Sequence, residues 1–198
     1  MRFLLVPALF LPVLFVLCAA GPADWPCVQR LVPQLTAATL WGGPEAVGDW
    51  RADARIAALV ADVAPRQRPV EEGVARLERF AAALPEPGRA NALALVFAGL
   101  VDATNAERTR VVENLRGLAR RQRDLTGTVA RVTAELRALP PDAPAAQREE
   151  VAGRRAFLIR DYEEVERTLR YACEVPGQME ARLGRFAQAL RQGSEAAR

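Results

Sequence analysis

Apolar residues recur at alternating steps of four and three in the second half of this 198-residue chain, and this spacing constrains the fold more than any other feature. Between residues 105 and 139 the repeat follows one seam, which reads Val111, Leu115, Leu118, Gln122, Leu125, Val129, Val132, Leu136 and Leu139. A sustained alternation of this kind places its members along one stripe of an α-helix and is typical of a coiled coil. The segment is therefore predicted to be a long helix that packs against a second helix.

A second helix with the same spacing follows a short turn. Residues 140–144 read Pro-Pro-Asp-Ala-Pro, and no helix tolerates three prolines at that spacing. The repeat resumes with Val151, Arg155, Leu158, Tyr162, Val165, Leu169 and Ala172, and it continues past Pro176, where a kink is expected. We therefore predict a long antiparallel helical hairpin over residues 105–191, followed by a frayed tail at 192–198.

Two polar residues, Gln122 and Arg155, interrupt the apolar seams. A single polar residue in a coiled-coil seam commonly fixes the register of the two helices at some cost in stability. We expect this role for both residues, in preference to a role in binding.

The first half of the mature chain, residues 21–104, is predicted to hold an irregular segment and three short helices. Residues 21–49 are rich in Pro and Gly, which mark turns and loops. Prolines then separate three stretches with helical patterns, and helices are expected over residues 53–64, 70–84 and 87–103. The tryptophans are expected to cover the base of the core; they are Trp25, Trp41 and Trp50.

The third short helix is expected to be central and to end where the long helix begins. Residues 92–101 are apolar almost all round, which is the pattern of a buried helix. Thr104 and Glu107 have the spacing of a capping box, so the long helix is predicted to begin at residue 105. The predicted fold is thus all-α: a helical bundle with a long antiparallel, coiled-coil-like hairpin, preceded by an irregular Pro/Gly/Trp-rich N-terminal segment.

Residues 1–20 have the layout of a secretory signal peptide. A short basic start precedes an apolar run at residues 3–17, and small residues follow up to the expected cleavage point after Ala20. Two prolines inside the run disfavour the alternative, a retained membrane anchor over residues 3–20. The mature chain is therefore expected to be periplasmic or secreted, and to contact a membrane only if this segment is uncleaved.

Cleavage of the signal would remove Cys18 and leave two cysteines, Cys27 and Cys173. Paired cysteines in an oxidising compartment commonly form structural disulfides. We predict a disulfide between them, which would pin the irregular N-terminal segment to the return half of the hairpin. A thiol redox pair is the alternative, but the Cys-x-x-Cys spacing that would favour it is not present.

The residue types that most enzyme sites require are missing. The sequence contains no histidine, and Ser194 is its only serine. Histidine is the usual general base and a common metal ligand, so Ser-His-Asp and Cys-His catalysis and His-containing metal sites are excluded. The sequence also lacks a Gly-rich phosphate loop and an oxygen-rich calcium loop. We therefore predict that the protein is not an enzyme and has no catalytic, cofactor-binding or metal-binding residues.

All 27 basic residues are arginine, since the sequence contains no lysine. Codon bias and a selected need for planar guanidinium groups are both compatible with this composition. The densest cluster lies on the long helix, at Arg116, Arg120, Arg121 and Arg123. One interpretation is a solvated face, neutralised in part by acids of the return helix. The other is a patch for an acidic protein partner or an anionic envelope surface, and the four residues are the candidate partner-binding patch.

The function predicted from these patterns is non-catalytic. The first hypothesis is an exported interaction or scaffolding factor that binds a protein of the cell envelope. The second is a periplasmic, chaperone-like helical binder, and the third is a thiol redox factor that uses Cys27 and Cys173. Nucleic acid is not expected as a partner, because the net charge is only +3 and aromatic residues make up only 6% of the chain. No small-molecule substrate is expected.

Overall fold

The computed structural model describes residues 24–195, and every regular element within them is a helix. In chain order the elements are α1 (Ala37–Leu40), a short 3-10 helix (Trp50–Ala52), α2 (Ala54–Val63), α3 (Val70–Ala83), α4 (Arg89–Ala138), α5 (Ala145–Ala172) and α6 (Val175–Glu195). The predicted all-α class is confirmed. The predicted signal segment lies outside the described residues. Among the residues described, no helix combines the length and the hydropathy that crossing a membrane requires.

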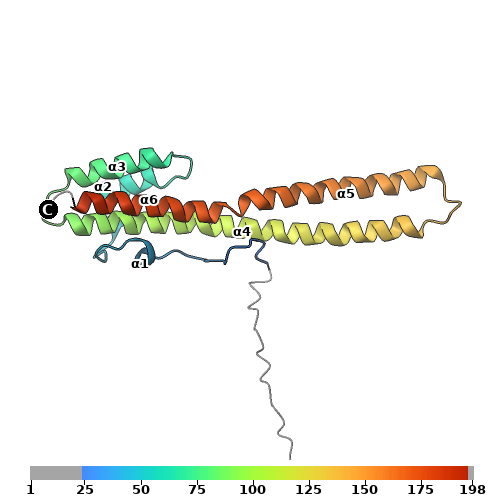
Figure 1. The fold of residues 1–198 in the computed structure, drawn as a ribbon, viewed down its shortest axis with the longest axis horizontal. Helices are drawn as coiled ribbons and strands as arrows, with labels where there is room; N and C mark the ends of the chain where they lie inside the picture. The colour runs from blue at the N-terminus through green and yellow to red at the C-terminus, as the bar shows by residue number, and fades with distance from the viewer. Residues whose placement is uncertain (1–23, 196–198) are drawn as a thin grey trace, which may run out of the picture.

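The part of the molecule that we call the body consists of α2, α3, α6 and the first half of α4 (Figure 1). Helix α6 packs against both α3 and α4, while α2 packs against α4. The centre of the core contains side chains that are at most 1% exposed, among them Ile56, Leu77, Phe97 and Phe186. Helix α2 begins after Asp53, whose carboxylate accepts hydrogen bonds from two backbone amides of the first turn. Helices α2 and α3 confirm two of the three short helices that the sequence predicts.

The predicted boundary near residue 104 is wrong, because α4 is a single helix of 50 residues. The side chain of Asn105 exchanges hydrogen bonds with the backbone N–H and carbonyl of Leu35, at 2.8 and 2.9 Å. The carboxylate of Glu107 pairs with Arg66 at 3.0 Å instead of reaching back to Thr104. The polar residues that resemble a helix start therefore make tertiary contacts in the middle of α4. The expectation that residues 92–101 are central holds, since this stretch lies in the core of the body.

Beyond the body, the second half of α4 pairs with α5 in an antiparallel hairpin, which we call the arm (residues 113–172; Figure 1). Helix α4 ends at Ala138 and α5 begins after Pro144, which confirms the proline-rich turn. The arm extends well past α2 and α3 (Figure 1). Its buried seam includes Leu115, Leu125, Val132, Val151 and Val165. The predicted helical hairpin is confirmed.

The return half of the hairpin consists of two helices, α5 and α6, which are interrupted at Cys173 and Glu174. Pro176 lies in the first turn of α6, where a helix does not need the amide hydrogen that proline lacks. The break therefore falls just before the proline at which a kink is predicted.

The predicted fraying of residues 192–198 is wrong for 192–195, because α6 extends to Glu195. The Arg191 guanidinium donates to the carbonyls of Leu40 and Trp41, at 3.2 and 2.7 Å, and Leu190 is completely buried. These contacts tie the last turns of α6 to the body. Residues 196–198 lie outside the described part of the chain.

The tryptophans occupy two different places. Trp41 stacks on Phe97 with ring centroids 5.1 Å apart, and Trp50 packs against the same core, as predicted. Trp25 instead belongs to an apolar cluster at the proximal end of the arm, with Cys27 and Leu115. The prediction that all three tryptophans cover the base of one core is therefore wrong for Trp25.

Candidate functional site

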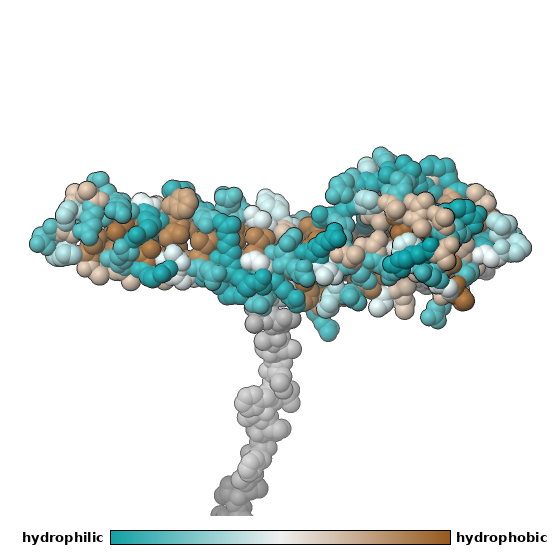
Figure 2. Space-filling model, turned by 180° about the vertical axis from the view of Figure 1, so that it is seen from behind, coloured by the Kyte–Doolittle hydropathy of each residue, from teal (hydrophilic) through white to brown (hydrophobic). Residues whose placement is uncertain are grey.

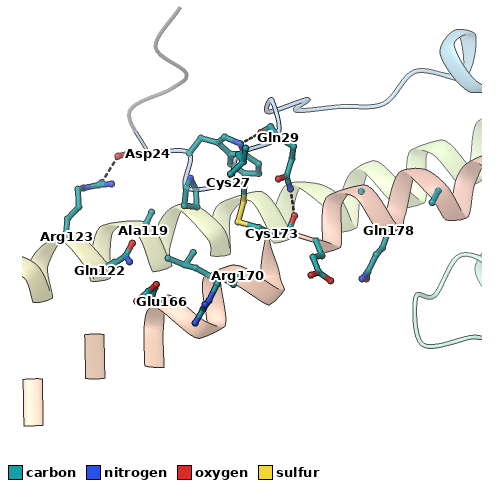
Figure 3. Close-up of a pocket in the computed structure, with 17 residues that line it drawn as sticks. Asp24, Cys27, Gln29, Ala119, Gln122, Arg123, Glu166, Arg170, Cys173 and Gln178 are labelled. Atoms are coloured by element: carbon teal, nitrogen blue, oxygen red, sulfur yellow. Dashed lines mark hydrogen bonds and ion pairs between the residues drawn. A yellow bond between two sulfur atoms is a disulfide. The ribbon is translucent and has the colours of Figure 1, made fainter. Parts of the chain in front are cut away.

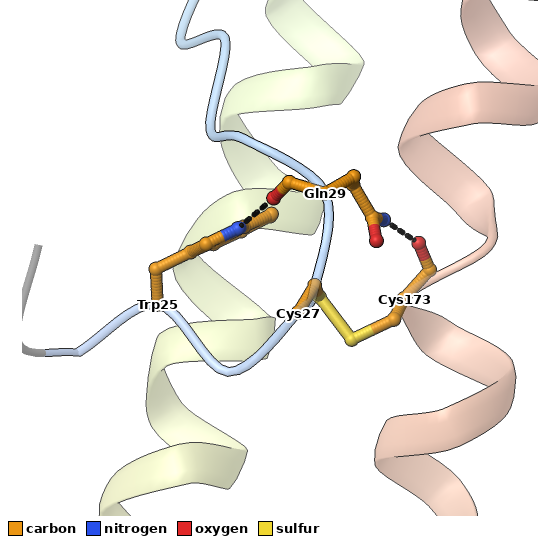
Figure 4. The surroundings of a disulfide bond; sticks show 4 residues. All are labelled: Trp25, Cys27, Gln29 and Cys173. Carbon is orange, nitrogen blue, oxygen red and sulfur yellow. Dashed lines mark hydrogen bonds between the residues drawn. A yellow bond between two sulfur atoms is a disulfide. The ribbon is translucent and has the colours of Figure 1, made fainter. Parts of the chain in front are cut away.

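The N-terminal segment is fastened to the break between α5 and α6 by a disulfide (Figure 4). The Cys27–Cys173 bond has an S–S distance of 2.07 Å and a Cα–Cα distance of 5.5 Å, which confirms the predicted pairing. Beside it, the Gln29 side chain donates to the Cys173 carbonyl, and the Trp25 indole N–H donates to the Gln29 carbonyl at 2.7 Å. The disulfide and the Gln29–Cys173 hydrogen bond thus fix this segment where the arm leaves the body, and the Trp25–Gln29 hydrogen bond closes a turn within the segment.

Arg108 of α4 is buried at the same place, which we call the junction because the arm meets the body there. Its side chain is only 2% exposed. Its Nε donates to the Val32 carbonyl at 2.8 Å, its Nη1 donates to the Pro176 carbonyl at 3.0 Å, and its Nη2 pairs with Glu180 at 2.8 Å. One guanidinium therefore joins α4, the N-terminal segment and the first turns of α6. The sequence analysis did not single out this residue.

An open cavity of about 930 Å³ lies at the junction (Figure 3). Asp24 and Arg123 form an ion pair of 2.6 Å at its edge. Val28 is fully exposed beside it. The walls come from the N-terminal segment, α4, α5 and α6, and include Trp25, Ala119, Gln122, Leu169 and Arg170. Within residues 24–195, no group of three or more His, Cys, Asp or Glu side chains is placed to hold a metal ion.

The four arginines of the candidate patch do not share one surface. Arg116, Arg120 and Arg123 follow a 4,3 spacing and occupy one stripe of α4, which we call the arginine face. Arg121 points instead toward α5, where it pairs with Asp161 at 2.7 Å. Arg123 pairs with Asp24 as described above. Inside the described range no carboxylate is within ion-pair distance of Arg116 or Arg120, so of the four arginines of the candidate patch these two are the ones open to a partner.

The polar seam residues have partners across the arm. The Gln122 amide donates to the Tyr162 hydroxyl at 3.4 Å, and the Arg155 Nε donates to the Thr133 hydroxyl at 2.9 Å. Each contact links α4 to α5 at a fixed level of the seam. This arrangement is the one that a register-fixing role requires.

Part of the arm's apolar seam remains uncovered. Figure 2 shows apolar side chains in line between the two helices, with hydrophilic side chains on either side. A pocket of about 460 Å³ opens between α4 and α5, with Val132 and Leu158 among its lining residues. Phe157 stands beside it and is 62% exposed. The sequence analysis missed Phe157, although an aromatic residue directly before a seam position of an aromatic-poor chain is a usable signal.

No protein-family model, no curated protein and no solved structure matches this chain.

Proposed function

We propose that the chain is an exported, non-catalytic helical protein that binds an acidic protein of the cell envelope and acts as an interaction or scaffolding factor. The single observation that supports this most is the arginine face. Arg116 and Arg120 lie at the proximal end of a long arm, and no carboxylate of the described residues neutralises them. Guanidinium groups bind carboxylates in a planar, bidentate manner, which suits an acidic protein surface.

Further observations support export and a scaffolding role in which the arm is held in a fixed orientation. The Cys27–Cys173 disulfide is compatible with an oxidising compartment, as is the apolar run at residues 3–17. The disulfide and the Arg108 contacts fix the root of the arm to the body. A root held in this way presents the arginine face in one orientation, which lowers the entropy lost when a partner binds.

The experiment is a quantitative capture from solubilised envelope fractions with the purified, oxidised protein. The test variant is R116E/R120E, which reverses both open cations. The matched control is R160E/R167E, which reverses two exposed arginines on α5 of the same arm. Both variants should keep the melting temperature of the wild type to within a few degrees, because Arg120, Arg160 and Arg167 are exposed and Arg116 is half-buried without an ion pair in the described chain. Substitutions at such surface positions change stability by about 0.5 kcal/mol or less.

We expect the wild type and the control to recover one partner in stoichiometric amounts, and the test variant to lose it. Equal recovery by the test variant would contradict the proposal. Recovery of many proteins in substoichiometric amounts would instead support the second candidate, a chaperone-like binder. That candidate is favoured by the exposed apolar side chains of Val28 and Phe157.

A further inference from the structure

A different surface of the arm, on the side of Phe157, carries charges that are complementary to themselves. At the end nearer the body, Arg121 of α4 pairs with Asp161 of α5 at 2.7 Å. At the end nearer the turn, Glu135 of α4 pairs with Arg154 of α5 at 2.5 Å. The cation is therefore on α4 in the first pair and on α5 in the second. Exchanging the two ends of this surface would bring each charge opposite its counter-charge.

The exchange has a defined centre. On α4 the midpoint between Arg121 and Glu135 is Thr128. On α5 the midpoint between Arg154 and Asp161 falls between Phe157 and Leu158. These three central residues line the same pocket, so the two midpoints lie at one level of the arm. A two-fold axis that crosses the arm from α4 to α5 at this level would lay α4 on α4 and α5 on α5, each antiparallel.

A second set of charges obeys the same symmetry. Asp124 and Arg131 are exposed and lie seven residues apart on α4, which places them on one stripe of the helix on either side of Thr128. Neither makes an ion pair with another residue of the described chain, although Arg131 donates to the Thr128 hydroxyl at 3.2 Å. About the same axis, Asp124 would face Arg131 of a second copy, and Arg131 would face its Asp124.

We propose that the Phe157 side of the arm binds a second copy of this chain, and that the two arms form an antiparallel four-helix bundle. The two Phe157 rings, each 62% exposed in the single chain, would meet next to the axis and cover the pocket residues Val132 and Leu158. A two-fold interface requires a self-complementary face, and an exposed aromatic side chain beside Val132 and Leu158 gives this face an apolar anchor. This inference goes beyond the proposed function, because it concerns a second copy of this chain. Arg116 and Arg123 lie on another stripe of α4 and stay open in the dimer, whereas Arg120, four residues before Asp124, borders the dimer surface.

The test is sedimentation velocity of the oxidised protein from about 1 µM to about 500 µM, the range in which a small interface associates. We expect a concentration-dependent monomer–dimer equilibrium. F157D removes the apolar anchor and should weaken the dimer about thirtyfold or more, as loss of an interface hot spot does. R116E is the control, because Arg116 lies on the arginine face away from Asp124 and Arg131, and it should dimerise like the wild type. Circular dichroism melts check that each variant is folded.

A charge exchange gives the sharper readout, because it changes no contact that folding needs. D124R alone and R131D alone should each weaken the dimer about two- to tenfold, since each creates two like-charge contacts about the axis. The double variant D124R/R131D restores both opposite-charge contacts and should dimerise like the wild type. The same symmetry brings Glu150 close to Glu164 of the second copy, so E150R should tighten the dimer.

Three results would overturn the proposal. The first is a wild type that stays monomeric throughout the range. The second is a dimer that F157D leaves intact, which would place the contact elsewhere on the molecule. The third is a double variant no stronger than its two parents, which would exclude the antiparallel register. Since the control variant reports on the arginine face, failure of this inference and failure of the proposed function are separate outcomes.

Discussion

Replacing Arg108 with Met tests whether the arm is fixed to the body by one buried guanidinium. Methionine keeps most of the apolar stem of the side chain and removes every hydrogen-bond donor. The change leaves the Val32 and Pro176 carbonyls without the donor that they have at 2.8 and 3.0 Å. It also leaves Glu180 without its cation at 2.8 Å.

The magnitude follows from the burial of each partner. A buried carbonyl that loses its donor costs about 1–3 kcal/mol, and removal of one partner of a buried ion pair costs about 3–5 kcal/mol in all. The side chain of Glu180 is 40% exposed and Val32 is 39% exposed, so water can solvate both partners in part, and most of the loss falls on the Pro176 carbonyl, whose bond to Arg108 is buried. We expect R108M to lower the free energy of unfolding by about 2–4 kcal/mol. For a chain of this length that is a fall in melting temperature of roughly 4–16 °C.

Urea unfolding of the oxidised protein, followed by circular dichroism, measures this loss. R110M is the matched control, because Arg110 is an exposed arginine two residues away on the same helix, and it should change the stability by about 0.5 kcal/mol or less. R108M/E180Q should be no less stable than R108M, since Glu180 contributes little once its cation is gone. An R108M variant within about 1 kcal/mol of the wild type would refute the assignment of the junction's stability to Arg108.

Two other perturbations test the same framework. The disulfide joins residues with a sequence separation of 146, so reduction should lower the free energy of unfolding by about 5 kcal/mol and the melting temperature by roughly 10–20 °C. An unchanged urea midpoint in the presence of reductant would contradict this. The C27A/C173A variant is the control and should be insensitive to reductant. At the start of α2, the side-chain hydrogen bond from Arg55, followed by backbone amides, lowers the pKa of Asp53 from 3.8 to about 2. The stability that this carboxylate contributes is therefore present above about pH 4 and is lost as the pH falls through about 2, so the stability difference between the wild type and D53N should shrink over that window and stay constant above it.

The sequence was most informative where a residue's role depends on spacing along one helix. The seam from Leu115 to Val132 and the proline turn define the hairpin because helical periodicity is a local property. The pairing of Cys27 with Cys173 followed from elimination, since no other cysteine remains after the expected cleavage.

The sequence analysis failed where a polar side chain has its hydrogen-bond or ion-pair partner in a distant part of the chain. Asn105 and Glu107 have the residue types of a helix start, yet their partners are Leu35 and Arg66, and nothing in the local sequence encodes those contacts. The arginine cluster shows the same limit within the candidate site. Adjacent residues on a helix point about 100° apart, so Arg120 and Arg121 lie on different stripes, and only the structure shows that Arg121 is paired with Asp161.

The backbone contacts of three arginines give a physical reason for arginine, and not lysine, at these positions. Arg108 donates to two carbonyls of the junction, and Arg191 donates to two carbonyls at the end of α1. Arg182 of α6 donates to three more, on Val63, Pro65 and Arg68, at 3.0, 3.1 and 2.7 Å.

In each case one planar guanidinium donates to carbonyls at the ends of helices or in the loops between them. A lysine ammonium is a compact point charge on a flexible stem and does not hold several carbonyls in a fixed plane. Codon bias would account for how often arginine occurs but not for where these three lie. In a chain with few aromatic side chains, such donors fix the loops of the body, and a fixed body is what the proposed function requires of a long arm that presents one face to a partner.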